Sequence, residues 1–239
     1  MNSTRKIAVI TGVIFIIATL TGPILATPLT PDLTATDYLT RFSEHTNQAA
    51  GGVLLWIISA FTGAGIAIAM YPVLKQQNAG LALGSVIFRT LEAAFYLVEK
   101  VCLLSLLTLS QQFRTAGAAD RQVLQAIGNL LVSVDGHAAL VAVFAFCVGA
   151  FMYYYLLFQS RLIPRWLSGF GIVAIIMMMA ACVLALFSGN LITSYIPLAA
   201  PIGVQEIVLG VWLIVKGFNP SAIASLSAKT ATNELLSAA

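Results

Sequence analysis

Residues Ser85 to Lys100 read SVIFRTLEAAFYLVEK, an apolar segment that carries four charged side chains. At about 100° per residue, five polar side chains of this segment would share roughly a quarter of the circumference of a helix: Ser85, Arg89, Glu92, Tyr96 and Glu99. A charge at membrane depth costs at least about 2.5–3.5 kcal/mol, so such residues usually face the inside of a helical bundle. The segment therefore predicts a membrane-spanning helix whose polar stripe points inward.

The composition of the whole chain agrees with a membrane protein. Of 239 residues, 59% are hydrophobic and 9% are charged, and the mean hydropathy is +0.94. Soluble domains carry about 25% charged residues, so the chain reads as a protein that crosses the membrane several times. The net charge of +3 comes without a basic run, which argues against nucleic acid as a partner and leaves the lipid bilayer as the main one.

Six apolar segments are long enough to cross a hydrocarbon core of about 30 Å. They predict an all-α, polytopic membrane bundle of six transmembrane helices, at about residues 7–26, 50–74, 80–110, 134–158, 166–187 and 197–216. We expect one six-helix domain over residues 1–218 and a flexible C-terminal tail over 219–239, which is rich in Ser, Ala and Thr. The first segment also fits a signal peptide cleaved near Ala26, although its length favours a retained helix.

Two longer loops connect the first four segments, and each contains an amphipathic pattern. Tyr38, Leu39 and Phe42 recur at helical spacing in the first loop, and an apolar face over residues 123–131 does so in the second. We expect a short surface helix in each loop. The positive-inside rule then places both chain termini in the cytoplasm of a cell-membrane protein and both loops outside, because the cationic residues cluster on one side: Arg5, Lys6, Lys75, Arg161, Arg165 and Lys216 against Arg41, Arg114 and Arg121.

The polar residues inside these segments are the candidates for a site. If the third, fourth and sixth spans meet, their polar groups line one cavity. We predict three catalytic carboxylates and five ligand-binding residues there: Glu92, Glu99 and Glu206 as the carboxylates, and Arg89, Tyr96, Asp135, His137 and Gln205 as the others. Two buried carboxylates that share Arg89 cannot both ionise cheaply, so one is expected to hold a proton near neutrality.

The same residues also have structural explanations. Arg89 and Glu92 are three residues apart and can form an ion pair that also ties in Glu206. Asp135 can cap the fourth span, and Gln205 can bridge helices. A lone histidine in a bundle, here His137, is more often hydrogen-bonded within the protein than a ligand or a base.

Familiar catalytic and metal-binding motifs are missing from the chain. It has no H-E-x-x-H, no P-loop and no G-x-S-x-G elbow. One histidine within the spans does not support a zinc or haem site, so we expect neither metal nor cofactor. The three cysteines, Cys102, Cys147 and Cys182, read as small apolar packing residues.

Several stretches resemble a known family. They are AMYPVLK at 69–75, GLALG at 80–84, Phe88-Arg89 with Glu92-Ala93, SRLIPRWLS at 160–168, Gln205-Glu206 and WLIVKGF at 212–218. Together they resemble a bacterial integral membrane family known as domain of unknown function 4386, over nearly the whole chain to about Ala222. The resemblance implies a six-helix membrane protein and brings no activity, substrate or cofactor with it.

Three hypotheses for the function follow from these residues. The first is a polar cavity that binds a small lipophilic or amphipathic molecule and processes it by acid catalysis, by analogy with small helical membrane cyclases. The second is a proton-coupled transporter that uses the same carboxylates. The third is a structural or regulatory membrane protein whose charges serve helix assembly. The sequence leaves the oligomeric state open.

Overall fold

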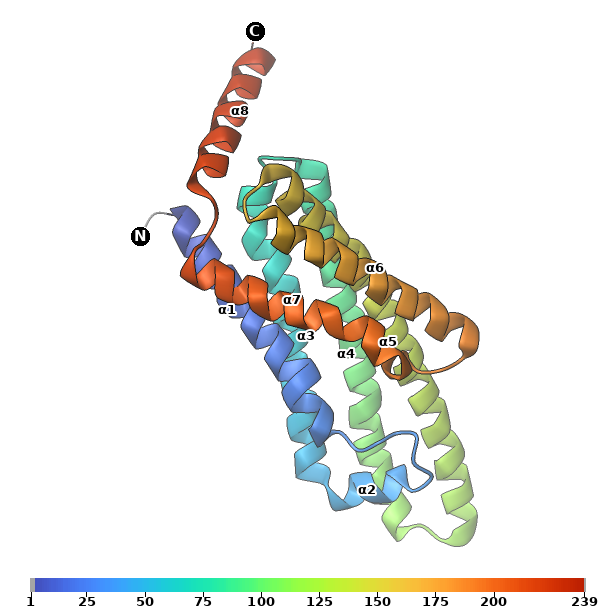
Figure 1. The fold of residues 1–239 in the computed structure, drawn as a ribbon. Helices are drawn as coiled ribbons and strands as arrows, with labels where there is room; N and C mark the ends of the chain where they lie inside the picture. The colour runs from blue at the N-terminus through green and yellow to red at the C-terminus, as the bar shows by residue number, and fades with distance from the viewer. Residues whose placement is uncertain (1–2, 239) are drawn as a thin grey trace.

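The computed structural model describes residues 3–238, and the side chains of residues 3–229. Helices make up nearly all of that part of the chain, which contains no β-strand. Figure 1 shows the α-helices, whose bounds are α1 Ser3–Thr19, α2 Tyr38–Glu44, α3 Thr46–Leu74, α4 Ala79–Thr115, α5 Ala118–Ser160, α6 Arg165–Ser188, α7 Ile196–Val215 and α8 Pro220–Ala238. A π-helical turn (Leu20–Ala26) and a 3-10 turn (Thr27–Leu29) extend α1, and a second 3-10 turn (Ile192–Tyr195) precedes α7.

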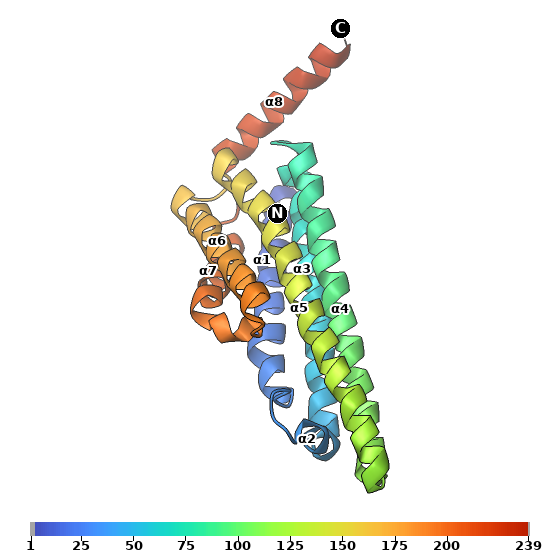
Figure 2. The ribbon, with the colours of Figure 1, turned by 90° about the vertical axis from the view of Figure 1, so that its right-hand side faces the viewer.

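Six of these helical segments are long and apolar enough to cross a membrane, which confirms the predicted all-α, six-span architecture. They are Ser3–Leu29, Thr46–Leu74, Ala79–Thr115, Ala118–Ser160, Arg165–Ser188 and Ile192–Val215. Spans that follow one another in the chain pack side by side, and α7 closes the ring against α1 (Figure 2). Large aromatic side chains fill the inside of this ring, where Phe15 and Tyr153 meet edge to face at 6.2 Å between ring centroids.

Helices α4 and α5 are much longer than a bilayer requires. With 37 and 43 residues, they measure about 55 Å and 65 Å at about 1.5 Å per residue. They pack against each other as a hairpin that continues past the other spans at one end of the molecule (Figures 1 and 2). The hairpin therefore projects beyond a hydrocarbon core of about 30 Å.

This hairpin corrects two expectations about the second loop. The amphipathic segment over residues 123–131 is helical, but it is the first part of α5 and no separate surface helix. No proline lies between residues 118 and 134, and Gly128 alone does not end the helix, so the backbone hydrogen bonds continue without a turn. Asp135 consequently lies within α5 instead of capping it.

The first loop contains a short helix, α2, as its amphipathic pattern predicts. Helix α2 buries Tyr38, Leu39 and Phe42, with exposed fractions of 3%, 1% and 0%. These side chains pack against α3 and α4 in a second apolar core, and the Tyr38 hydroxyl donates to Asn129 Oδ1 at 3.0 Å. Burial raises the pKa of this hydroxyl above its ordinary value. Helix α2 thus closes the projecting end of the bundle.

The chain after residue 218 forms a helix, α8, which the composition did not predict. Its first turns are held to the bundle, where Ala222 and Leu226 join the main apolar core. The division into a domain over 1–218 and a flexible tail over 219–239 stays a prediction.

Candidate functional site

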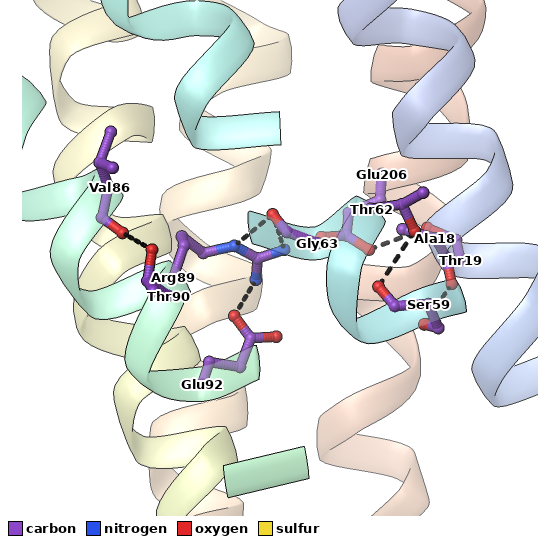
Figure 3. Close-up of polar contacts among 10 residues, drawn as sticks. All are labelled: Ala18, Thr19, Ser59, Thr62, Gly63, Val86, Arg89, Thr90, Glu92 and Glu206. Atoms are coloured by element: carbon purple, nitrogen blue, oxygen red, sulfur yellow. Dashed lines mark hydrogen bonds and ion pairs between the residues drawn. The ribbon is translucent and has the colours of Figure 1, made fainter. Parts of the chain in front are cut away.

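Arg89 lies at the centre of one polar group inside the bundle, which we call the inner cluster (Figure 3). Its Nη1 lies 2.7 Å from Glu92 Oε2, an ion pair whose atoms are not aligned for a hydrogen bond. Nε and Nη2 donate to the backbone carbonyl of Gly63 at 3.2 and 3.1 Å. The guanidinium also lies 4.7 Å from the centre of the Phe146 ring. Because Arg89 is 2% exposed and Glu92 7% exposed, this pair is held away from lipid.

Two glycines make room for this arginine. A Cβ at Gly63 of α3 would lie 3.1 Å from Nη2 of Arg89. On the other side, a Cβ at Gly149 of α5 would lie 3.1 Å from both the Cγ and the backbone nitrogen of Arg89. The guanidinium therefore reaches the Gly63 carbonyl because both neighbouring helices present a glycine at this level.

Glu206 belongs to the same level of the bundle but does not join the ion pair. Thr19 donates its hydroxyl to Glu206 Oε2 at 2.9 Å, and Ser59 donates to the Ala18 carbonyl at 2.8 Å. In the described part of the chain, the carboxylate within ion-pair distance of Arg89 is that of Glu92. Of the two carboxylates predicted to share Arg89, Glu92 forms the ion pair, whereas Glu206 interacts with Arg89 at longer range and accepts its hydrogen bond from Thr19 of α1. The contacts in Figure 3 link α4, α3, α1 and α7.

Gln205 lies next to Glu206 on α7, and its amide joins three helices. It accepts a hydrogen bond from the Tyr154 hydroxyl of α5 and donates to the Leu167 carbonyl of α6 at 3.2 Å. The side chain is fully buried. These contacts are those of the bridging residue that the sequence allowed as an alternative to ligand binding.

A second polar group surrounds a pocket of about 410 Å³ towards the end of the bundle that carries α2, and we call it the outer pocket. Lys100 and Glu99 form an ion pair there, with Nζ and Oε1 2.7 Å apart. Lys100 Nζ also lies 4.5 Å from the centre of the Trp56 ring. The lining comes from α3, α4, α5, the turn before α7 and the loop after α1, and it includes Asp32, Leu103, Asp135, Leu191 and Ile192.

The wall formed by residues 30–34 depends on how α1 ends. Pro23 cannot donate a backbone hydrogen bond, and the helix widens into the π-helical turn around it before the chain leaves the bundle. Thr30 to Thr34 then lie along the pocket. Hydrogen bonds from the hydroxyl and backbone N–H of Thr34 hold the pKa of Asp32 below its ordinary value, so this carboxylate is ionised at neutral pH.

Two carboxylate oxygens at the outer pocket have no hydrogen-bond donor. They are Glu99 Oε2 and Asp135 Oδ1, both buried within the protein. A buried acceptor without a partner costs about 1–3 kcal/mol, and more when it is charged. Glu99, Asp135 and Asp32 together bring three carboxylates to a pocket whose lining has one cation, Lys100. The outer pocket therefore offers two acceptors without donors and the ionised Asp32 to a bound group.

The structure separates the predicted site residues into two groups. Glu99 and Asp135 line the outer pocket, whereas Arg89, Glu92, Glu206 and Gln205 lie deeper. Tyr96 lies between the groups, with its ring centroid 5.7 Å from that of Trp56.

His137 is placed with neither group. It is exposed, and its Nδ1 lies 2.7 Å from the Ser133 carbonyl on its own helix. Two residues of helix turn through about 200°, so His137 and Asp135 face opposite sides of α5.

Sequence reasoning missed two residues of the outer pocket, Trp56 and Asp32, whereas Lys100 is one of the four charged side chains of the segment Ser85 to Lys100. Trp56 sits in an apolar run, and Asp32 lies in a loop far from the stripe in sequence. Neither of those two has a local pattern that marks it.

A ring of six apolar helices around buried charged side chains defines a polytopic membrane protein of the helical-bundle class. The chain belongs to the family described as domain of unknown function 4386, whose family model matches residues 10–217. No curated protein and no solved structure matches it.

Proposed function

We propose that the outer pocket binds a small amphipathic molecule with a cationic, hydrogen-bond-donating head group. The observation that carries this proposal is the pair of buried acceptors without donors, Glu99 Oε2 and Asp135 Oδ1. An alkylammonium group supplies up to three donors and one positive charge, which suits these oxygens and the ionised Asp32.

The apolar lining accounts for the rest of such a ligand. Leu103, Leu191 and Ile192 line the pocket beside the carboxylates, and its volume of about 410 Å³ lies in the range of small-molecule sites, about 300–1,000 Å³. A short alkyl chain would lie there, with its head group at Glu99 and Asp135. In this proposal Glu99 contacts the ligand, and Glu99 is the residue that would donate the proton in any acid catalysis in the pocket.

The inner cluster supports a different role for the deeper charges. Arg89 contacts Glu92, the Gly63 carbonyl and the Phe146 ring, and Glu206 accepts a hydrogen bond from Thr19. We assign these residues to helix assembly, the third hypothesis from the sequence, because their contacts are made within the protein.

The cationic residues support an orientation for the pocket. Both ends of the described chain lie at the end of the bundle opposite α2 (Figure 1). Arg5, Lys75, Arg161 and Lys216 belong to helix ends and turns near those termini. By the positive-inside rule we propose that the termini are cytoplasmic and that the outer pocket opens on the other side of the cell membrane.

Ligand binding can be followed at Trp56. Replacing the two other tryptophans, Trp166→Phe and Trp212→Phe, leaves Trp56 as the single tryptophan, which can be excited selectively. We expect n-octylammonium at pH 7 to change its fluorescence saturably in lipid nanodiscs, whereas octanoate and octanol do not. Asp135→Asn should weaken the apparent affinity roughly tenfold or more, because a hydrogen bond to a charged group contributes about 1.5–3 kcal/mol.

The matched control is Asp37→Asn, an exposed carboxylate outside the pocket with 55% of its side chain accessible. It should leave the titration unchanged. An equal response to octanol, or an affinity that Asp135→Asn does not alter, would contradict the proposal.

A further inference from the structure

A separate pocket lies at the opposite end of the bundle from the outer pocket, and we call it the basic pocket. It has a volume of about 600 Å³ and forms where α5 turns into α6 beside the end of α7. Arg161, Arg165 and Lys216 line it together with Trp212 and Asn219, and none of the lining residues that the structure describes is a carboxylate. Three cations therefore surround one hollow, and the described part of its wall holds no compensating acid.

These cations keep their charge available. In the part of the chain whose side chains the structure describes, the ion pairs join other residues, and none involves Arg161, Arg165 or Lys216. All three side chains are exposed. The guanidinium of Arg165 lies 5.3 Å from the centre of the Phe158 ring, a contact that orients it without neutralising it.

The frame of the basic pocket is fixed by backbone contacts. The backbone N–H of Asn219 donates to the Leu162 carbonyl at 2.8 Å, which fastens the segment after α7 to the turn between α5 and α6. Arg161 ends α5 in the left-handed region at φ 55°. The cations are therefore brought together by the fold, although they come from separate parts of the chain.

The cationic surface continues around Lys216. An adjoining pocket of about 490 Å³ shares Lys216 and Phe218 with the basic pocket and adds Arg5. Arg5 donates to the Leu213 and Ile214 carbonyls at 3.2 and 2.6 Å, where α7 ends. A fourth positive charge thus lies near the other three.

Tryptophans place the basic pocket at the level of lipid head groups. Trp166 has 61% of its surface exposed, and its ring meets that of Trp212 edge to face at 6.4 Å. Tryptophan side chains concentrate where the hydrocarbon core meets the head groups. Arginine binds phosphate oxygens through paired N–H donors, and basic pockets between membrane helices hold anionic head groups.

From these observations we infer that the basic pocket binds the phosphate group of an anionic membrane phospholipid. The inference is independent of the ligand of the outer pocket. Free phosphate has the same chemistry, and it is the alternative source that the experiment must separate from lipid.

The experiment is native mass spectrometry of the full-length protein released from detergent micelles. The micelles contain phosphatidylglycerol or phosphatidylcholine, and inorganic phosphate is added to the surrounding solution as a competitor. Phosphatidylglycerol is expected to bind at least tenfold more tightly than phosphatidylcholine, which carries a phosphate but no net charge. The Arg161→Gln/Arg165→Gln protein should lose at least tenfold in affinity for phosphatidylglycerol.

Arg114→Gln/Arg121→Gln is the matched control. These arginines are also exposed, and Arg121 lies over the Phe113 ring at 5.5 Å as Arg165 does over Phe158. They lie at the loop between α4 and α5, away from the basic pocket. The control should bind phosphatidylglycerol as the unaltered protein does, and an equal loss in both variants would overturn the inference.

Two further results decide the remaining cases. Inorganic phosphate that displaces phosphatidylglycerol at equal concentration would overturn the assignment to lipid, as would equal binding of the two lipids.

If the double variant unfolds, Lys216→Gln tests the same pocket from α7. This variant is expected to weaken phosphatidylglycerol binding severalfold, and unchanged binding would overturn the inference. Lipid binding measured by mass spectrometry does not depend on the fluorescence of Trp56, so this inference and the proposed function of the outer pocket can fail separately.

Discussion

Arg89→Met is expected to lower the free energy of unfolding by about 3–5 kcal/mol, because it leaves the carboxylate of Glu92 buried without its charge partner. Glu92 is 7% exposed, and its ion pair with Arg89 spans 2.7 Å. The variant also leaves the Gly63 carbonyl without the two N–H donors that it accepts from Arg89. Unfolding of the protein in mixed micelles with increasing sodium dodecyl sulfate measures the loss.

A double-mutant cycle isolates the ion pair. Arg89→Met/Glu92→Leu removes both charges, so it should be less destabilised than the sum of its single variants by at least about 2 kcal/mol. The matched control is the pair Asp37 and Arg41, which are joined at 2.9 Å but exposed to 55% and 49%. Its coupling should be at most about 0.5 kcal/mol. Additive effects at Arg89 and Glu92 would rule out a structural role for the inner cluster.

Gly12→Ala is expected to have the second large effect and to lower the free energy of unfolding by about 3 kcal/mol or more. A Cβ at Gly12 would lie 2.5 Å from the backbone oxygen of Gly210 and 2.8 Å from Cγ1 of Ile214. The backbone of α7 cannot rotate away as a side chain can, so the helices must separate where α1 and α7 close the ring. The same unfolding experiment measures the change.

Gly203→Ala is the control for this crossing, since it adds the same methyl group to α7. A Cβ there would meet nothing within 4 Å. Alanine favours a helix over glycine by about 1 kcal/mol in soluble hosts, so this variant should be neutral or slightly stabilised. Similar changes in the free energy of unfolding for Gly12→Ala and Gly203→Ala would contradict this prediction, because they would show that the α1–α7 crossing can accommodate an added methyl group.

The polar stripe shows which features can be predicted from residues that are close in sequence. Ser85, Arg89 and Glu92 are buried at 1%, 2% and 7% exposure, as helical periodicity predicts for an inward face. The spans follow from length and hydropathy in the same way. Both features depend on residues that are close in sequence, which is why they could be predicted.

The site depends on contacts that sequence spacing does not encode. Glu206 bonds to Thr19 instead of Arg89 because of where α1 crosses α7, and no spacing within either helix specifies that crossing. Trp56 and Asp32 reach the outer pocket through tertiary packing. His137 is different, since its opposition to Asp135 on α5 follows from helix geometry alone and was predictable.

The inner ion pair also bears on how α4 enters the bilayer during synthesis. This helix has the lowest mean hydropathy of the six spans, so it is the hardest to insert. Arg89 and Glu92 are three residues apart on one helix, so they can neutralise each other without a contact from another span. The Gly63 carbonyl that completes the arrangement belongs to α3, which leaves the ribosome first. The order of helices in the chain thus supplies the ion-pair partner and the carbonyl acceptor of Arg89 by the time that α4 is inserted, and the Phe146 ring follows with α5.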